Sequence, residues 1–338
     1  MKHVIRKSVA VLAAVALVAV GLVGCSRNKN GLQKVRVCEV THSIFYAPQY
    51  AAIALGYFAD EGIEIELSNG QGADAVMAAV LSGNIDIGFA GPEASIYVYN
   101  EGAADHTQVF AQITKRDGSF LIGREKDDNF SWDKVKGKVV LPGRRGGVPY
   151  MTLEHVLRQN GINPATDTTL DNSVQYAMMT AAFTGGTGDY VTAFEPTASM
   201  LEQQGQGYIV ASVGEASGDI PYTAYFAKKS YIEKNGDLVQ RFTNAVDRGQ
   251  QWVATHSAAE IAQLVADQFP DTDIALLTKA VESYQAIGAW NTTPVMGKEG
   301  FDRLQRVMTE AGELTKTADY NQVVNNTFSE KAVASLTK

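Results

Sequence analysis

Residues 35–99 alternate between short apolar stretches with the spacing of strands and longer stretches with the spacing of helices. VRVCEV is short and β-branched, IEIEL alternates apolar and acidic residues, and IDIGFA is again apolar. The segments between them have helical periodicity, and Gly56 and Gly83 follow their ends, where a left-handed cap costs least. Strands that alternate with helices predict parallel strands joined by right-handed crossovers.

Polar, aromatic and glycine-rich residues follow each of these strands, in segments 41–46, 69–74 and 91–95. In a parallel sheet, ligands bind beyond the carboxyl ends of the strands. These segments therefore suit a small-molecule site better than a hydrophobic core.

The same pattern restarts after Trp132. KVVLPGRRGGVPYMTLEHVLRQNG predicts a strand, a glycine-rich loop and a helix, NSVQYAMMTAAF and GDYVTAFEPTASMLEQQG predict two more strand-to-helix units, and GYIVAS predicts a strand. After the strand-like TAYFAK, the remaining chain has helical periodicity and needs a sheet to pack on. We expect an α/β fold in which lobe 1 comprises residues 33–121 plus 221–338 and lobe 2 comprises 122–220. Two crossovers then form a hinge beside a ligand cleft.

The first 24 residues predict an export signal. A basic start is followed by an apolar run from Val9 that is too short to span a bilayer comfortably. The run ends in LVGC, which resembles the bacterial lipobox. We therefore expect residues 1–24 to be a signal peptide, Cys25 to be lipidated, and residues 25–32 to be a tether on the extracytoplasmic face of the cell membrane. An ordinary secretory signal or a short anchor is the alternative.

Charge and cysteine content exclude some function classes. Removal of residues 1–24 moves the formal charge from -8 to -11, because that segment holds three basic and no acidic side chains. Nucleic-acid binding needs a basic patch, so nucleic acid is not an expected partner. If Cys25 carries lipid, no disulfide can form within the chain, and Cys38 inside a strand is expected to be a buried, inert thiol.

Five stretches carry a family resemblance: APQYAAIALGYFADEGIEIEL, GADAVMAAVLSGNIDIGFAGPEA, VKGKVVLPG, LRQNGINPATDTTL and FEPTASML. In this order, along essentially the whole mature chain, they resemble the solute-binding lipoproteins of ABC importers. The similar branch serves alkanesulfonates, taurine, nitrate and thiamine-pyrimidine precursors. The resemblance implies a type II periplasmic-binding-protein fold, lobe closure on a small solute, and delivery to a membrane permease. We expect the partners to be that ABC permease and its ATPase, and the protein to be a monomer. Where many relatives carry Trp before the acidic-Pro pair, this chain has Phe194.

Charged residues at the expected cleft favour two different kinds of ligand. Arg144 and Arg145 precede a predicted helix N-terminus, and this combination can bind a sulfonate, phosphate or carboxylate, although a solvated loop is the alternative. Glu195 could accept hydrogen bonds from an amine or aminopyrimidine, or could cap the next helix instead. Glu93 raises the same question more weakly.

Aromatic residues at the strand ends could stack on a planar ring or pack under the hinge. The expected ligand-binding residues are His42, Ser43, Phe45, Tyr46, Gln71, Gly91, Glu93, Asp117, Arg144, Arg145, Gly146, Tyr150, Phe194, Glu195 and Tyr222. No metal is expected, because His42 has no Cys or second His at ligand spacing.

No catalytic motif or cofactor motif is convincing. Gly70 to Ala75 fits G-x-G-x-x-A, but the following strand ends in Ala90-Gly91 without the acidic residue that a ribose needs, so no cofactor is expected. We predict a binding protein for a nitrogen heterocycle such as a thiamine pyrimidine precursor, with a sulfonate, taurine or nitrate as the alternative cargo. Two further hypotheses are a sensory partner of a membrane receptor and a pyrimidine-synthesis enzyme of the same branch. The export signal and the single cysteine of the folded body oppose the enzyme.

Overall fold

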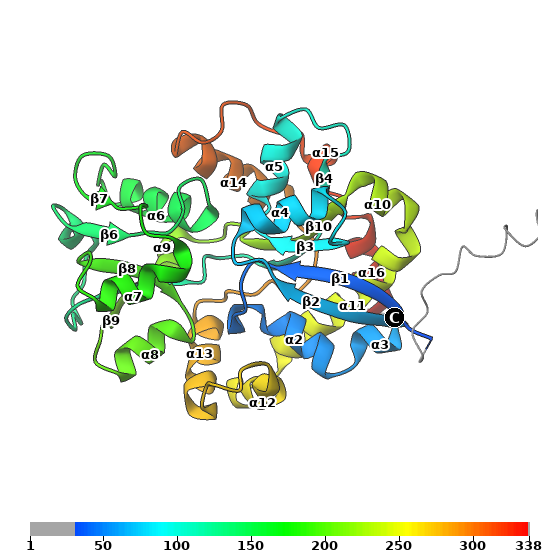
Figure 1. The fold of residues 1–338 in the computed structure, drawn as a ribbon, viewed down its shortest axis with the longest axis horizontal. Helices are drawn as coiled ribbons and strands as arrows, with labels where there is room; N and C mark the ends of the chain where they lie inside the picture. Colours follow the sequence, from blue (N-terminus) through cyan, green and yellow to red (C-terminus); the bar gives the residue numbers. More distant parts are fainter. Residues whose placement is uncertain (1–30, 337–338) are drawn as a thin grey trace, which may run out of the picture.

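The computed structural model describes residues 31–336, so the predicted signal peptide, Cys25 and most of the tether lie outside the described residues. Two five-stranded sheets lie next to each other, and helices pack around both (Figure 1). The predicted α/β fold with two sheet-based lobes is confirmed. Within residues 31–336, no helix is long and apolar enough to cross a membrane.

The first sheet has the order β2-β1-β3-β10-β4, and its strands are β1 (Gln33–Glu39), β2 (Ile63–Asn69), β3 (Ile87–Ala90), β4 (Thr107–Thr114) and β10 (Thr223–Lys228). β1 runs parallel to β2 and β3, whereas β10 runs antiparallel to β3 and β4. The helices of this half of the chain are α2 (Ala47–Ala54), α3 (Tyr57–Asp60), α4 (Ala73–Leu81) and α5 (Glu93–Asn100). The three strands that the opening pattern predicts are therefore confirmed.

The second sheet has the order β7-β6-β8-β5-β9, and its strands are β5 (Ser119–Gly123), β6 (Val139–Leu141), β7 (Thr169–Leu170), β8 (Tyr190–Phe194) and β9 (Tyr208–Ser212). Its helices are α6 (Val148–Gln159), α7 (Met179–Thr184), α8 (Thr197–Gln203) and α9 (Val213–Ser217). The strand predicted at the start of NSVQYAMMTAAF is wrong. Asp171 Oδ1 accepts the N–H and hydroxyl of Ser173 and so turns the chain into a loop.

The chain passes between the sheets twice, before β5 and before β10. β5 pairs along its whole length with β8, so the predicted lobe boundary after residue 121 falls inside a strand of the second sheet. The first crossover therefore lies between Thr114 and Ser119. The precise extent of each lobe stays a prediction; below, lobe 1 means the elements of the first sheet and the helices packed on it, and lobe 2 means those of the second.

The C-terminal helices return to lobe 1 as predicted. They are α10 (Lys229–Lys234), α11 (Gly236–Thr255), α12 (Ala258–Val265), α13 (Ile274–Ala286), α14 (Lys298–Glu310), α15 (Tyr320–Val323) and α16 (Thr327–Leu336), with short 3-10 turns η1 (Ile44–Tyr46), η2 (Trp132–Val135), η3 (Tyr176–Met178) and η4 (Ala266–Gln268). α11 packs against α2 and α16 and buries Leu238, Phe242 and Val246. It approaches α2 so closely that a Cβ at Gly249 would lie 2.4 Å from the Pro48 oxygen.

Candidate ligand-binding cavity

A cavity of about 470 Å³ lies between the two sheets. Its walls come from the ends of β1, β3, β6 and β8, the loops after β2 and β7, and the crossover that enters β10. The parallel strands thus place the cavity beyond their carboxyl ends, as their order predicts. The expected residues that line it are Tyr46, Gln71, Gly91, Glu93, Arg144, Phe194 and Tyr222.

Glu93 is the buried acid of this cavity. It begins α5 in lobe 1, is 2% exposed, and its Oε2 has no hydrogen-bond partner. Burial raises the pKa of Glu93 to about 7, against the lowering effects of the N–H groups at the start of α5, the Arg144 guanidinium and the Val148 N–H. An unpaired buried carboxylate oxygen is costly, so this group has a strong tendency to accept a hydrogen bond from a ligand.

Aromatic side chains form another part of the wall. Phe194 and Tyr222 line the cavity with their ring centroids 6.2 Å apart, and Tyr176 lies 6.4 Å from Phe194. Behind them, Phe45 contacts both Phe194 at 5.7 Å and Tyr222 at 5.6 Å. Phe45 itself is fully buried, so it supports the aromatic wall and does not line the cavity.

Arg144 lines the cavity opposite the N-terminus of α4. Its Nη1 lies 3.3 Å from Asp74 Oδ2, and both side chains are substantially exposed. The ion pair joins lobe 2 to lobe 1, because Arg144 follows β6 and Asp74 lies in the first turn of α4. The positive charge that the sequence suggests for an anion is therefore already paired at the cavity.

Three expected binding residues near Arg144, namely Arg145, Gly146 and Tyr150, lie outside the cavity lining. Arg145 Nε contacts Glu313 Oε1 at 2.9 Å, and the Gly146 oxygen accepts a hydrogen bond of 3.0 Å from the Tyr97 hydroxyl. Tyr150 is mostly buried on α6, where burial and then the charge of Glu154 raise its pKa. These residues join the lobes or pack α6 and do not face the cavity.

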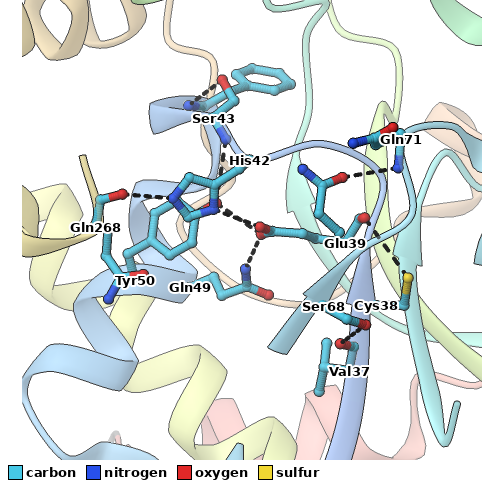
Figure 2. A network of polar contacts seen from close by, with 12 residues as sticks. Val37, Cys38, Glu39, His42, Ser43, Gln49, Tyr50, Ser68, Gln71 and Gln268 are labelled. Atoms are coloured by element: carbon cyan, nitrogen blue, oxygen red, sulfur yellow. Dashed lines mark hydrogen bonds and ion pairs between the residues drawn. The ribbon is translucent and has the colours of Figure 1, made fainter. Parts of the chain in front are cut away.

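His42 belongs to a separate buried network at the end of β1, which Figure 2 shows. Its Nδ1 lies 2.7 Å from Glu39 Oε1, and its Nε2 lies 2.8 Å from the Gln268 oxygen. Both partners are acceptors, so both ring nitrogens must carry protons, and the hydrogen bond to Glu39 raises the pKa of His42. Tyr50 and Gln49 donate to the other oxygen of Glu39. His42 thus fastens α2 and η4 to β1.

Glu195 caps a helix. It is 1% exposed, and its carboxylate accepts the Ser199 N–H at 2.9 Å and the Ser199 hydroxyl at 2.8 Å. Its main chain bridges the lobes, because its N–H donates to the Tyr284 hydroxyl and its carbonyl accepts from Ser43 Oγ. Ser43 and Glu195 therefore hold the lobes together outside the cavity lining, and the helix-capping alternative describes the Glu195 carboxylate.

Asp117 lies in the first crossover and is fully buried. Its Oδ1 accepts the Ser119 N–H at 2.6 Å, whereas its Oδ2 has no partner. Burial raises the pKa of Asp117 to about 7, although the Ser119 and Tyr222 hydroxyls lie near enough to oppose the rise. Asp117 thus lies behind Tyr222, a residue of the cavity wall whose buried hydroxyl is also unpaired.

The lobes contact each other on both sides of the cavity. On one side, Arg145 pairs with Glu313 and His155 pairs with Glu310. Glu310 is the last residue of α14, and Glu313 lies just beyond it. On the other side, Lys279 Nζ of α13 contacts Glu202 Oε2 of α8 at 2.8 Å. The structure therefore has the lobes drawn together around the cavity.

Sequence reasoning missed the loop that follows β7. Residues 172–177 line the cavity, and Tyr176 in this loop remains 40% exposed. The available signal is a polar and aromatic run between a short strand and a helix, which is the same signal that identifies the loops after β1, β2 and β3. Within residues 31–336, no group of three or more His, Cys, Asp or Glu side chains is arranged to hold a metal ion.

Comparison with known proteins identifies a family and a fold. A family model described as NMT1/THI5 like matches residues 44–259. The Bacillus subtilis protein named "Putative binding protein YtlA" is 43% identical over 313 residues, which cover 93% of each chain.

Solved structures share the two-lobed fold. The alkanesulfonate-binding protein SsuA from Xanthomonas axonopodis, bound to MOPS, aligns with a TM-score of 0.70 and 17% identity over 87% of this chain and 98% of its own. The periplasmic nitrate-binding protein NrtA from Synechocystis PCC 6803 has the same TM-score and identity, over 90% of this chain and 89% of its own. The fold also occurs in an enzyme, because the desulfurization enzyme DSZB aligns with a TM-score of 0.65 and 14% identity over 90% of this chain and 99% of its own.

Proposed function

The chain belongs to the NMT1/THI5-like family, and from this premise we propose that it is the solute-binding protein of an ABC-type importer. The observation that carries the proposal is the cavity between two lobes, with an unpaired, buried carboxylate oxygen of Glu93 at its wall. A cleft closed by two hinged lobes is a common trap for small molecules. Lipidation at Cys25 would hold the protein at the extracytoplasmic face of the membrane.

The cavity chemistry favours a planar nitrogen heterocycle that carries an amino group. Glu93 Oε2 would accept an N–H of such a ligand, and a cationic ring would also satisfy its charge. Phe194 and Tyr222 would present aromatic surface to the ring. A thiamine pyrimidine precursor has these features. From the sequence we expect Glu195 to accept the hydrogen bond of the amino group. In the structure Glu93, and not Glu195, lines the cavity, so we assign this role to Glu93.

Closure would couple binding to transport. Residues of both lobes line the cavity, so a solute that contacts both favours the closed arrangement over the open one. Only this difference in affinity between the two arrangements shifts their populations. The interlobe contacts of Arg145 and His155 with the α14 side of lobe 1 would add to that preference.

A sulfonate, taurine or nitrate is the second candidate cargo. Arg144 favours it, because an Arg side chain at the cavity can bind an oxyanion. The names of the alkanesulfonate-binding and nitrate-binding structures support this class of solute for the fold. The expectation that the chain is not an enzyme stays a prediction.

A thermal-unfolding panel on the chain from Ser26 onward tests the proposal. The compounds are thiamine, aminopyrimidines, riboflavin, taurine, alkanesulfonates and nitrate. A ligand present at about 100 times its Kd should add about 2.7 kcal/mol to the free energy of unfolding. For a chain of this size, that is a shift of several degrees in Tm.

The Glu93→Gln variant serves as the matched control for the aminopyrimidine arm. It should fold and lose most of the shift that an aminopyrimidine produces. If the natural chain shows no shift with any compound, and native mass spectrometry of the same sample finds no retained ligand, the proposed cargo classes are wrong. A shift that is equal in the natural chain and in Glu93→Gln would remove Glu93 from the recognition of that compound.

A further inference from the structure

The N-terminus of α6 faces the cavity. α6 has 12 residues, and its N-cap Gly147 offers no side-chain hydrogen bond to the first turn. Gly147, Val148 and Pro149 line the cavity, and Arg144 lies just before them. Among these residues only Val148 offers a free N–H, because the Gly147 N–H donates to the Arg144 oxygen and Pro149 has none. This N–H, the positive end of the helix dipole and the neighbouring guanidinium together suit an anion.

The protein places one of its own carboxylates at this position. Glu93 reaches across from lobe 1, and the Val148 N–H and the Arg144 guanidinium of lobe 2 both stabilise its charged form. The Glu93 and Ala94 N–H groups at the start of α5 act on the same carboxylate. The side chain therefore lies at the cavity between the N-terminus of its own helix, α5, and that of α6 in lobe 2. Its Oε2 nevertheless has no partner, and Glu93 is part of the cavity wall.

Gly91 makes this arrangement sterically possible. A Cβ at Gly91 would lie 1.9 Å from Glu93 Oε2, so only glycine at this position lets the carboxylate lie over the end of β3. The strand end and the side chain are thus fitted to each other. This fit indicates a placed carboxylate and not a surface acid that happens to fold inward.

We propose that Glu93 is the residue that determines the charge class of the solute, because its carboxylate occupies the anion position of α6 and excludes anions in favour of cationic or N–H-donating solutes. This inference rests on the proposed function, since it concerns the same cavity. The charged groups around the cavity agree with it. Arg144 already faces both Glu93 and Asp74, so a bound sulfonate or nitrate would add a third negative charge beside one guanidinium.

Protonation of the Glu93 carboxylate should allow anions to bind in the cavity. The groups that face Glu93 from the surrounding elements are Arg144, with its partner Asp74, and the phenols of Tyr46, Tyr97 and Tyr222. Burial raises the pKa of all three phenols, so they stay neutral between pH 5.5 and pH 8. In that range Glu93 loses its charge as the pH falls. Asp117, which lies behind Tyr222, also has a raised pKa of about 7, so the Glu93→Gln variant is needed to separate the two carboxyls.

Binding of methanesulfonate and of nitrate, measured by calorimetry, tests the inference. At pH 8 the natural chain should bind both anions weakly, and Glu93→Gln, which removes only the charge, should bind at least one of them at least about 30-fold more tightly. Glu93→Ala also leaves space at α6 and should gain as much or more. Glu299→Gln, which makes the same charge change on an exposed side chain of α14, should leave the natural affinities unaltered.

A pH comparison uses the unmodified protein and so does not depend on the folding of any variant. Between pH 8 and pH 5.5 the natural chain should gain clearly more anion affinity than Glu93→Gln, in which Asp117 is the remaining buried carboxyl that titrates near the cavity. Two results would overturn the inference: anion binding by the natural chain at pH 8 as tight as that of the variants, or no gain of anion binding in either folded variant and none in the natural chain at pH 5.5.

These results are separable from the test of cargo. If no heterocycle binds the natural chain but the variants gain anions, the proposed cargo fails and the role of Glu93 stands. If a heterocycle binds the natural chain but either of the two overturning results is found with the anions, the proposed cargo stands. The proposed role of Glu93 then fails.

Discussion

In each lobe a strand is followed within three residues by a buried glutamate beside a proline, and the two glutamates have different roles. In lobe 1, β3 leads through Pro92 to Glu93 at the start of α5. In lobe 2, β8 leads to Glu195 and Pro196 before α8. Both side chains are almost completely buried. The Glu195 carboxylate makes two hydrogen bonds with Ser199 of the helix that follows it, whereas Glu93 leaves one oxygen unpaired at the cavity.

The position of each glutamate relative to its helix accounts for the difference. Glu195 lies just before the N-cap Pro196, so its side chain can reach the first turn of α8. Ser199 is short and polar, so its N–H and hydroxyl both reach back to Glu195. Glu93 instead follows the N-cap Pro92 and is itself the first residue of α5. Tyr97, four positions later, directs its hydroxyl across the cleft to the Gly146 oxygen at 3.0 Å. A buried acid is therefore structural when the adjoining helix satisfies it, and it is available to a ligand when the helix does not.

The largest effect is expected from Glu195→Ala. The substitution leaves the buried Ser199 N–H and hydroxyl without their acceptor and removes packed volume, so the free energy of unfolding should fall by about 3 to 5 kcal/mol. Urea denaturation of the natural chain and the variant measures the change. A loss below about 1 kcal/mol would show that the Glu195 carboxylate contributes little to the fold, and the contrast with Glu93 would then fail.

Glu93→Gln should change the pH dependence of stability. Because burial raises the pKa of Glu93 from 4.5 to about 7, its contribution favours the fold below pH 4.5 and is lost as the pH rises toward and through 7. Between pH 4.5 and a pH well above 7, the contribution of Glu93 to the free energy of unfolding should fall by about 3 kcal/mol. The variant should therefore lose less stability than the natural chain between pH 5 and pH 8. Parallel stability curves for the two proteins would contradict this expectation.

Ser199→Ala should weaken the satisfied site by a smaller amount. It removes the hydroxyl that donates to Glu195 Oε1 but keeps the backbone N–H that donates to Oε2. We expect a loss of about 1 to 2 kcal/mol in the free energy of unfolding. Ser82→Ala, at an exposed helix end, is the matched control. Equal effects of the two substitutions would show that the bond to Glu195 has no special weight.

The smallest effect is expected from Arg144→Gln, which should change the pKa of Glu93. The Arg144 charge lowers the pKa of Glu93, so its removal should raise that pKa further. The guanidinium is about half exposed, so screening by salt should reduce the effect. Carbon-13 NMR titration of the Glu93 carboxyl at low and high salt measures it. A fall in the pKa of Glu93 would mean that Arg144 does not act on this carboxylate.

The sequence predicts the fold and the place of the cavity because both follow from local periodicity. The alternation of strands and helices indicates the parallel order, and the polar segments after the strands indicate the ligand edge. Glycines and prolines at helix ends sharpen the boundaries, as Pro48 and Gly56 do around α2.

The sequence cannot show which polar side chains are already satisfied. Arg145 finds Glu313, which is 168 residues away, and His42 finds the Gln268 oxygen, which is 226 residues away. Such partners depend on how the lobes and the C-terminal helices pack. The case of Glu195 differs, because its partner Ser199 is local and the pattern itself indicates a capping role as one of two possibilities. Spacing alone does not decide between capping and ligand binding.

The position of β10 between β3 and β4 has a consequence for the order of assembly. β10 comes after the whole second sheet in the chain, so lobe 1 cannot complete its own sheet until residues 223–228 have been synthesised. Until then β3 and β4, whose residues are buried in the finished protein, each lack the neighbour that covers one edge. A nascent or truncated chain that stops before residue 223 would expose these edges and be prone to aggregate. The inserted lobe therefore makes the whole chain a single unit of folding and of quality control.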